Sequence, residues 1–172
     1  PLPHTKQILQ IALNSNGTRL ITSTIGSARI WDLDDSNPTP SGKKISGESD
    51  NSFRAEFSPD GKIVLTTALD KALLWDAETG ELIHSFDHEF NLFSARFSPG
   101  GKRILVTGPA IDSKIPLPGF AILWDIATGK RLVELPHEDQ VRNTAFTPDG
   151  ETIITQCKDN GVRFWHVGTG QL

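Results

Sequence analysis

Short runs of apolar and polar residues, each closed by a turn sequence, recur along the chain. Runs that mix apolar and polar residues lead into Pro, Asp or Gly turns at 52–57, 92–97 and 141–146. Such turns favour a tight reversal between antiparallel strands. Runs rich in β-branched residues, typical of buried strands, follow at 62–67, 103–108 and 152–157.

Two further apolar runs complete each set. The third ends at or next to a tryptophan, at 72–76, 121–125 and 162–166, and the fourth follows at 81–86 and 131–135. No window shows the 3.6-residue period and capping residues of a helix. The pattern therefore predicts an all-β chain with four strands in each unit of roughly 44 residues.

Three markers repeat in step with these runs. The tryptophans Trp31, Trp75, Trp124 and Trp165 are 44, 49 and 41 residues apart. The turn reads "FSPDGK", "FSPGGK" and "FTPDGE" in three copies and "LNSNGT" in the first. A histidine precedes the turn by nine residues in three copies, at His4, His88 and His137. Four copies of one unit are therefore present.

The order His, F-S-P-D-G, T, L-W-D and T-G resembles the WD-repeat (WD40) β-propeller family. The residues of the "FSPDGK" and "LWDxxTG" motifs resemble bacterial versions of the repeat in particular. The resemblance covers essentially the whole chain, with repeats at about 4–47, 48–87, 88–136 and 137–172. It implies a β-propeller of four-stranded antiparallel blades, with about four blades in this chain. These blades would be part of a larger ring, usually of seven or eight, or would be completed by another chain.

The resemblance also implies a buried hydrogen-bond network of His, Ser or Thr, Asp and Trp in each blade. The fourth repeat has the full set, His137, Thr155, Asp159 and Trp165. The other repeats have partial sets: Thr66, Asp70 and Trp75; His88, Thr107 and Trp124; His4, Thr22 and Trp31. Because buried polar groups must satisfy one another, we expect a structural and not a catalytic role.

Aromatic and arginine residues mark the beginning of the first strands. Phe53 and Phe93 occupy the position that Arg142 holds in the fourth repeat, and Arg54 follows Phe53. By the resemblance, these residues lie near the channel mouth on the partner-binding face, and such side chains anchor interfaces. Alternatively, Phe53 and Phe93 pack between blades.

The third repeat carries an insertion at 108–119, where other repeats have a short turn. Pro116 and Pro118 favour an extended loop, and Ile115 and Leu117 add apolar groups. The insertion is either a partner-binding loop or a neutral one that packs on a neighbouring element. Another long connection, 34–51, is interpreted as a surface loop with 43–45 as a weak edge strand.

Composition narrows the partner classes. A net charge of −4 and a pI near 5.7 argue against a general nucleic-acid binder. No apolar run is long enough to cross a membrane, and the N-terminal residues do not resemble a signal peptide. Cys157 is the only cysteine, so a reducing compartment is predicted, and we expect a cytoplasmic protein.

The chain shows no pattern typical of an enzyme. His84 and His88 are four residues apart but lie in a predicted strand and the loop after it, not on a helix. The Gly-Gly-Lys at 100–102 lacks the earlier glycine, the following Ser or Thr and the helix of a phosphate loop. We therefore predict no catalytic, cofactor-binding or metal-binding residue.

These features predict a non-catalytic scaffold that binds a partner protein or another domain of its own chain. Two alternatives remain: a regulatory propeller of a larger signalling ATPase or kinase, and an enzymatic, quinoprotein-like or peptidase-associated propeller. The absence of methionine suggests a segment of a longer protein. Residues 169–172 and 1–4 align with the two parts of one fourth strand. Either the chain is a window from a longer array, or its ends meet, and a homo-oligomer or additional blades would complete the ring.

Overall fold

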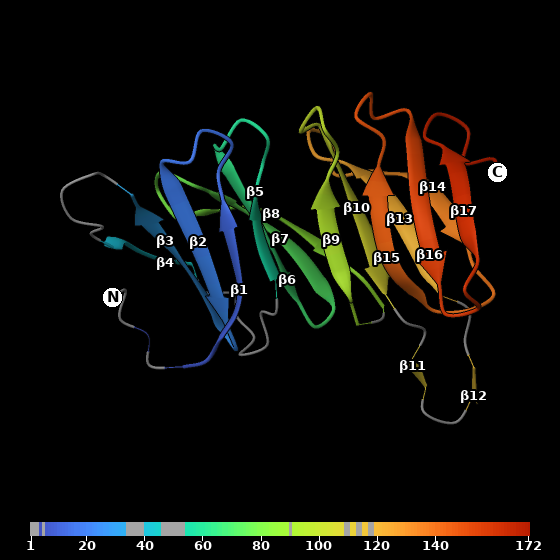
Figure 1. Ribbon diagram of the computed structural model, residues 1–172, viewed down its shortest axis with the longest axis horizontal. Helices are drawn as coiled ribbons and strands as arrows, with labels where there is room; N and C mark the ends of the chain where they lie inside the picture. Colours follow the sequence, from blue (N-terminus) through green and yellow to red (C-terminus); the bar gives the residue numbers. More distant parts are fainter. Residues whose placement is uncertain are drawn as a thin grey trace. The chain divides into compact units, whose positions relative to one another are not determined.

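The structure is a computed structural model that describes residues 4, 6–33, 40–45, 54–89, 91–108, 111–112, 115–116 and 119–172. In these residues it consists of β-strands and turns without helices (Figure 1). The predicted all-β class is thereby confirmed. The chain divides into two compact units, Pro1–Asp87 and His88–Leu172.

The N-terminal unit contains two four-stranded antiparallel sheets (Figure 1). The first has the order β1(Ile8–Leu13), β2(Arg19–Thr24), β3(Ser27–Asp32) and β4(Pro40–Ile45). The second has the order β5(Arg54–Phe57), β6(Ile63–Ala68), β7(Lys71–Asp76) and β8(Leu82–Asp87). Each sheet is thus a simple meander of consecutive strands, as expected of a propeller blade.

The C-terminal unit repeats this meander. The third sheet contains β9(Ser94–Phe97), β10(Arg103–Gly108), β13(Phe120–Asp125) and β14(Arg131–Pro136). Between β10 and β13, the insertion forms a small hairpin of β11(Ile111–Asp112) and β12(Ile115–Pro116) (Figure 1). The fourth sheet contains β15(Val141–Phe146), β16(Thr152–Cys157) and β17(Val162–His166).

The related sequences "SPDG", "SPGG" and "TPDG" close the first hairpins of the second, third and fourth sheets in the same way. The amide of Gly61 donates to the carbonyl of Ser58 at 2.8 Å. The bonds from Gly101 to Ser98 and from Gly150 to Thr147 measure 2.9 and 2.8 Å. All three glycines have a positive φ of 67–73°, which side chains with a Cβ rarely adopt.

Within each unit, the tryptophan side of the second sheet packs against the opposite side of the first. In the N-terminal unit, one apolar cluster joins Ile21, Ile30 and Ile45 of the first sheet to Val64 and Trp75 of the second. Strand β1 also lies beside β5. The C-terminal unit has an equivalent cluster, which contains Leu105, Leu123, Leu135, Ile153, Trp165 and Val167. Burial of these side chains is the main stabilising contribution to each pair of sheets.

Strand β4 is longer than the sequence predicted. A weak edge strand was expected at 43–45, but β4 extends back to Pro40 and pairs with β3 through a bulge. The sequence "PSGK" at its beginning has no apolar alternation, so only backbone pairing to β3 reveals it as a strand. Ile45 is fully buried between the two sheets and holds the end of the strand in place.

The residues after β17 form a turn that also occurs before β8 and β14. The amide of His166 donates to the carbonyl of Gln171 at 2.9 Å, as Asp76 does to Glu81 and Asp125 to Lys130. In the second and third sheets a fourth strand follows this turn. Among the described residues of the fourth sheet it does not, so the strand expected to begin at 169–172 is not formed.

Substitution of Gly119 by alanine should destabilise the chain. An added Cβ would overlap the backbone carbonyl oxygen of Asp139 and lie 3.0 Å from the Cα of Gln140. Neither backbone atom can move without displacing the loop before β15, so a loss of about 1–3 kcal/mol is expected. Urea unfolding measures it. Gly100→Ala is the control, because its Cβ would have nothing within 4 Å, and equal losses in the two variants would contradict the prediction.

Candidate functional site

A continuous series of buried hydrogen bonds begins in the fourth sheet and ends on β14 of the third. The indole Nε1–H of Trp165 donates to Oγ1 of Thr155 at 2.9 Å. The same Oγ1 lies 2.8 Å from Nε2 of His137, and Nδ1 of that histidine lies 2.8 Å from the carbonyl of Leu135. Because a carbonyl only accepts, Nδ1 carries the proton and Nε2 accepts from the threonine hydroxyl. With a neutral imidazole at His137, each polar side-chain atom in this series of hydrogen bonds therefore has a partner.

The surroundings keep His137 neutral. Burial, the largest effect, lowers the pKa of its imidazole, and the charge of Arg163 lowers it further. The hydrogen bond to Leu135 and the charge of Asp159 act in the opposite direction. Protonation would also place a second donor on Nε2, where the threonine hydroxyl already donates. The histidine is therefore a structural hydrogen-bond acceptor.

The first and second sheets contain part of this arrangement. Trp31 donates to Thr22 at 2.8 Å, and Trp75 donates to Thr66 at 2.9 Å. In the first sheet the ring of His4 packs on Trp31 with centroids 5.0 Å apart, close to the 5.1 Å between His137 and Trp165. The tryptophan–threonine bond is thus common to three sheets, while the histidine–threonine bond of the fourth is not.

The third sheet uses aromatic packing at the same place. His88 stands edge-on to Trp124 at 5.3 Å between centroids and stacks on Phe120 at 6.2 Å. Thr107 directs its hydroxyl to the carbonyl of Ser94 at 3.5 Å. An aromatic residue at position 120 therefore brings a second ring to the histidine that the other sheets lack.

The two aspartates of the expected network lie away from its buried part. Asp159 is exposed and forms an ion pair with Arg163 at 2.6 Å, and it accepts from the amide of Gly161 at 2.7 Å. Asp70 is exposed in the turn between β6 and β7. Asp159 acts on His137 only through its charge. Its local ion pair closes the turn before β17.

Several predicted partner-binding residues are exposed at the beginning of first strands. Arg54 is the first residue of β5, and Arg142 lies at the second position of β15. Phe93 immediately precedes β9 and is 45% exposed. Ile115 lies in the hairpin strand β12, paired with Asp112. Phe53 and Leu117, also predicted, lie outside the described residues.

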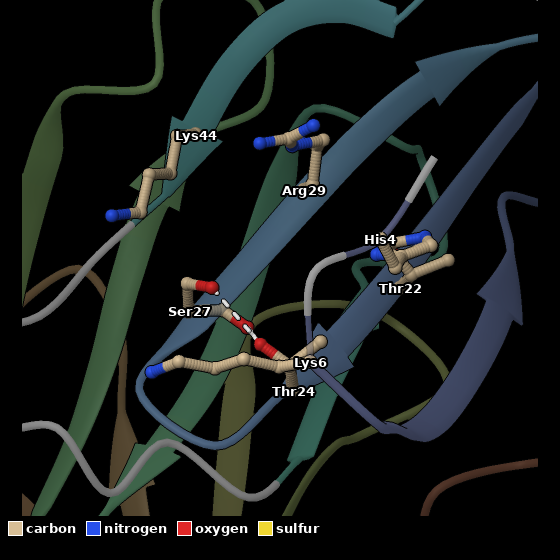
Figure 2. A pocket seen from close by; sticks show the side chains of 7 residues that line it. All are labelled: His4, Lys6, Thr22, Thr24, Ser27, Arg29 and Lys44. Atoms are coloured by element: carbon tan, nitrogen blue, oxygen red, sulfur yellow. Dashed lines mark hydrogen bonds between the residues drawn. The ribbon is translucent and has the colours of Figure 1, made fainter. Parts of the chain in front are cut away.

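Two cavities lie on the tryptophan sides of the first and third sheets. The cavity in the first, of about 180 Å³, is lined by basic and hydroxyl side chains, His4 and Arg29 among them (Figure 2). The cavity in the third, of about 240 Å³, has both Arg131 and Glu134 in its lining. Sequence analysis missed the basic cavity because its residues come together only through the pairing of β3 with β4.

No three His, Cys, Asp or Glu side chains in the described ranges meet in a geometry that could hold a metal ion. Cys157 is buried, and burial raises the pKa of its thiol, which disfavours the reactive thiolate. Within the same ranges, no helix is long and apolar enough to cross a membrane.

Comparison with known proteins identifies part of the chain. Residues 129–166 match the WD40 family, described as "WD domain, G-beta repeat". The predicted resemblance is therefore confirmed for this segment, which runs from the residues before β14 to the end of β17. The search of curated proteins found no match. The matched repeat begins in the third sheet and ends in the fourth, so one sequence repeat links two blades.

The neutral His137 predicts a pH dependence of stability. Because its pKa is lowered in the folded chain, the unfolded state binds the proton more readily, and stability falls as the pH decreases below about 6.5. Urea unfolding between pH 8 and pH 5 should show a smaller decrease for His137→Gln than for the unchanged chain. His166→Gln, at an exposed position, is the control. An identical pH profile for His137→Gln would contradict the assignment.

Thr155→Val should be more destabilising than Thr66→Val. Loss of the Thr155 hydroxyl leaves both Trp165 and His137 without their buried partner, whereas among the described residues the Thr66 hydroxyl bonds to Trp75 alone. Each unsatisfied buried group costs about 1–3 kcal/mol, so a larger decrease is expected at position 155. Thermal or urea unfolding measures the difference in stability between the two variants, which both replace a threonine hydroxyl by a methyl group. A smaller loss at 155 would disprove the shared role of its hydroxyl.

Proposed function

We propose that this chain is a non-catalytic interaction scaffold of the WD-repeat type, which binds a partner protein or another domain of its own chain. The observation that carries the proposal is the exposure of Arg54, Phe93 and Arg142 at or next to the beginning of the first strands of paired, well-packed sheets. Arginine and aromatic side chains dominate the binding energy of protein interfaces. WD40 domains are in general scaffolds of this kind.

The framework supports such a role on physical grounds. Because strand pairing already fixes the backbone, a partner that binds at the strand ends must order side-chain rotamers but not the main chain. Arg54 and Arg142 are exposed, and no carboxylate within the described residues forms an ion pair with either. In either unit, an acidic partner surface would therefore meet an unneutralised guanidinium group and would not compete with an internal ion pair.

Charge reversal at these positions tests the proposal. The tagged chain and the double variant Arg54→Glu/Arg142→Glu would each be used to capture proteins from an extract of the native source. Quantitative mass spectrometry then compares the amount of each captured protein. A true partner should be depleted at least about tenfold by the double variant, as expected for interface anchors. Circular dichroism would show that both proteins are folded.

Lys62→Glu/Lys130→Glu is the matched control, since it makes the same charge change at exposed positions in turns. A partner retained by this control and lost from the arginine variant supports the scaffold role. If both variants retain the partner equally, these arginines are not part of the interface. Catalytic turnover or tight binding of a small-molecule cofactor by the purified chain would argue for an enzymatic propeller instead.

A further inference from the structure

The basic cavity of the first sheet has an unusual lining. Four of its side chains are basic, and they come from three segments that surround the cavity (Figure 2): His4, Lys6, Arg29 and Lys44. The remaining lining residues carry hydroxyl groups, and no carboxylate contributes to the described lining. The chain as a whole has a net charge of −4, so this cavity is a local exception. Such a concentration of positive charge attracts anions.

The pairing of three strands brings two of these charges together. Thr22 on β2 pairs with Arg29 on β3, and Arg29 pairs with Lys44 on β4. Residues directly opposite each other in a sheet lie on the same face, so the row places two cationic side chains on one face of the sheet. Like charges in this position are destabilising unless something neutralises them.

The third sheet shows that the fold does not require this charge. Arg29 precedes Trp31 by two residues, and Ile122 precedes Trp124 by the same interval. The residue paired with Ile122 is Glu134, which is thus the counterpart of Lys44. An apolar residue and an acid occupy the positions where the first sheet has two cations. The two cations are therefore a feature of the first sheet, and a sheet of this kind forms without them.

Within the described ranges, no ion pair neutralises Arg29 or Lys44. Within the described residues, Arg19, Lys71 and Arg163 pair with carboxylates, whereas Arg29 and Lys44 do not. The guanidinium of Arg29 instead lies over the Trp31 ring, 5.5 Å from its centroid. This contact with the indole ring holds the Arg29 side chain in place. It does not neutralise the guanidinium, which has no counter-ion in the described part of the chain.

Two polar groups in the lining also have hydrogen-bonding capacity that no described residue uses. Thr22 accepts from Trp31 at 2.8 Å, but no described residue accepts its own hydroxyl proton. Nε2 of His4 is buried without a hydrogen bond to any described residue. In the fourth sheet the equivalent groups, Thr155 and His137, bond each other at 2.8 Å. The first sheet thus leaves unused, among its described residues, the hydrogen-bonding capacity that the fourth sheet uses internally.

We propose that this cavity binds a phosphoryl group, either as free phosphate or as the phosphomonoester of a peptide. A phosphomonoester carries a charge of about −1.5 to −2 and three acceptor oxygens, which match several cations and a hydroxyl donor better than a singly charged carboxylate does. The volume of about 180 Å³ is below the roughly 300–1,000 Å³ of cavities that enclose a drug-sized ligand. It therefore suits a small anion or the end group of a larger molecule.

Titration with inorganic phosphate tests the proposal directly. The chain has four tryptophans, so an ¹⁵N-labelled sample gives few indole N–H signals, and Trp31→Phe identifies the one beside the cavity. At constant ionic strength, phosphate should shift the Trp31 signal saturably and raise the melting temperature. Acetate should shift it much less. No saturable shift of the Trp31 signal would overturn the proposal.

Lys44→Glu is the decisive variant, because it introduces the acid that the third sheet has at the equivalent position. It should weaken phosphate binding at least about tenfold. Without phosphate it should be at least as stable as the unchanged chain, since it removes a like-charge pair and supplies a partner for Arg29. Lys130→Glu, the same charge change at an exposed position in the other unit, should bind phosphate normally. Equal binding by the two variants would overturn the proposal.

A short neutral peptide with one phosphoserine, compared with its unphosphorylated form, distinguishes the two sources of the phosphoryl group. Tighter binding of the phosphopeptide than of free phosphate assigns the cavity to a phosphorylated protein segment, and weaker binding assigns it to the free anion. Either outcome supports a phosphoryl site, provided that Lys44→Glu abolishes it. Binding of both peptides with equal affinity, unaffected by Lys44→Glu, contradicts it.

Discussion

The fold depends on the burial of one sheet face against another. A single four-stranded meander of this size has apolar side chains on both faces and cannot bury them alone. In each unit the tryptophan side of the second sheet covers the opposite side of the first, so that Trp75 and Trp165 hold equivalent places in two separate clusters. In both units the same sides of the two sheets pack together. The repeat therefore determines how neighbouring sheets pack as well as where strands form. The WD40 match at 129–166 crosses from one sheet to the next and contains both sides of that interface.

On this constant framework, the polar interior varies from sheet to sheet. The fourth sheet connects Trp165, Thr155 and His137 in a continuous series of bonds, and burial keeps the histidine neutral. The first sheet has the same residue types but leaves His4 and Thr22 facing a cavity with basic walls. A buried polar group must be satisfied by the protein, by water or by a ligand. The same three-residue pattern can therefore stabilise one blade and form the floor of a binding site in another.

Much of the fold was predictable because its determinants are local. The turn glycines, the β-branched strands and the spacing of the tryptophans predicted four antiparallel units, and the structure contains the corresponding sheets. The errors occurred where local sequence carries little information. Strand β4 begins in the turn-like "PSGK", and only its bonds to β3 define it as a strand. Asp159 was expected in the buried network, but a neighbouring arginine, Arg163, pairs with it at the surface.

By itself, the sequence determined the all-β class, the repeat and the period of that repeat. These features follow from residue spacing, since a strand alternates its side chains with a period of two and a turn needs its glycine at one position. Only the tertiary structure decided which face of each sheet is covered, and which polar groups are satisfied. It also decided that Arg29 and Lys44 lie on one face of the first sheet, because register across strands depends on residues distant in the chain.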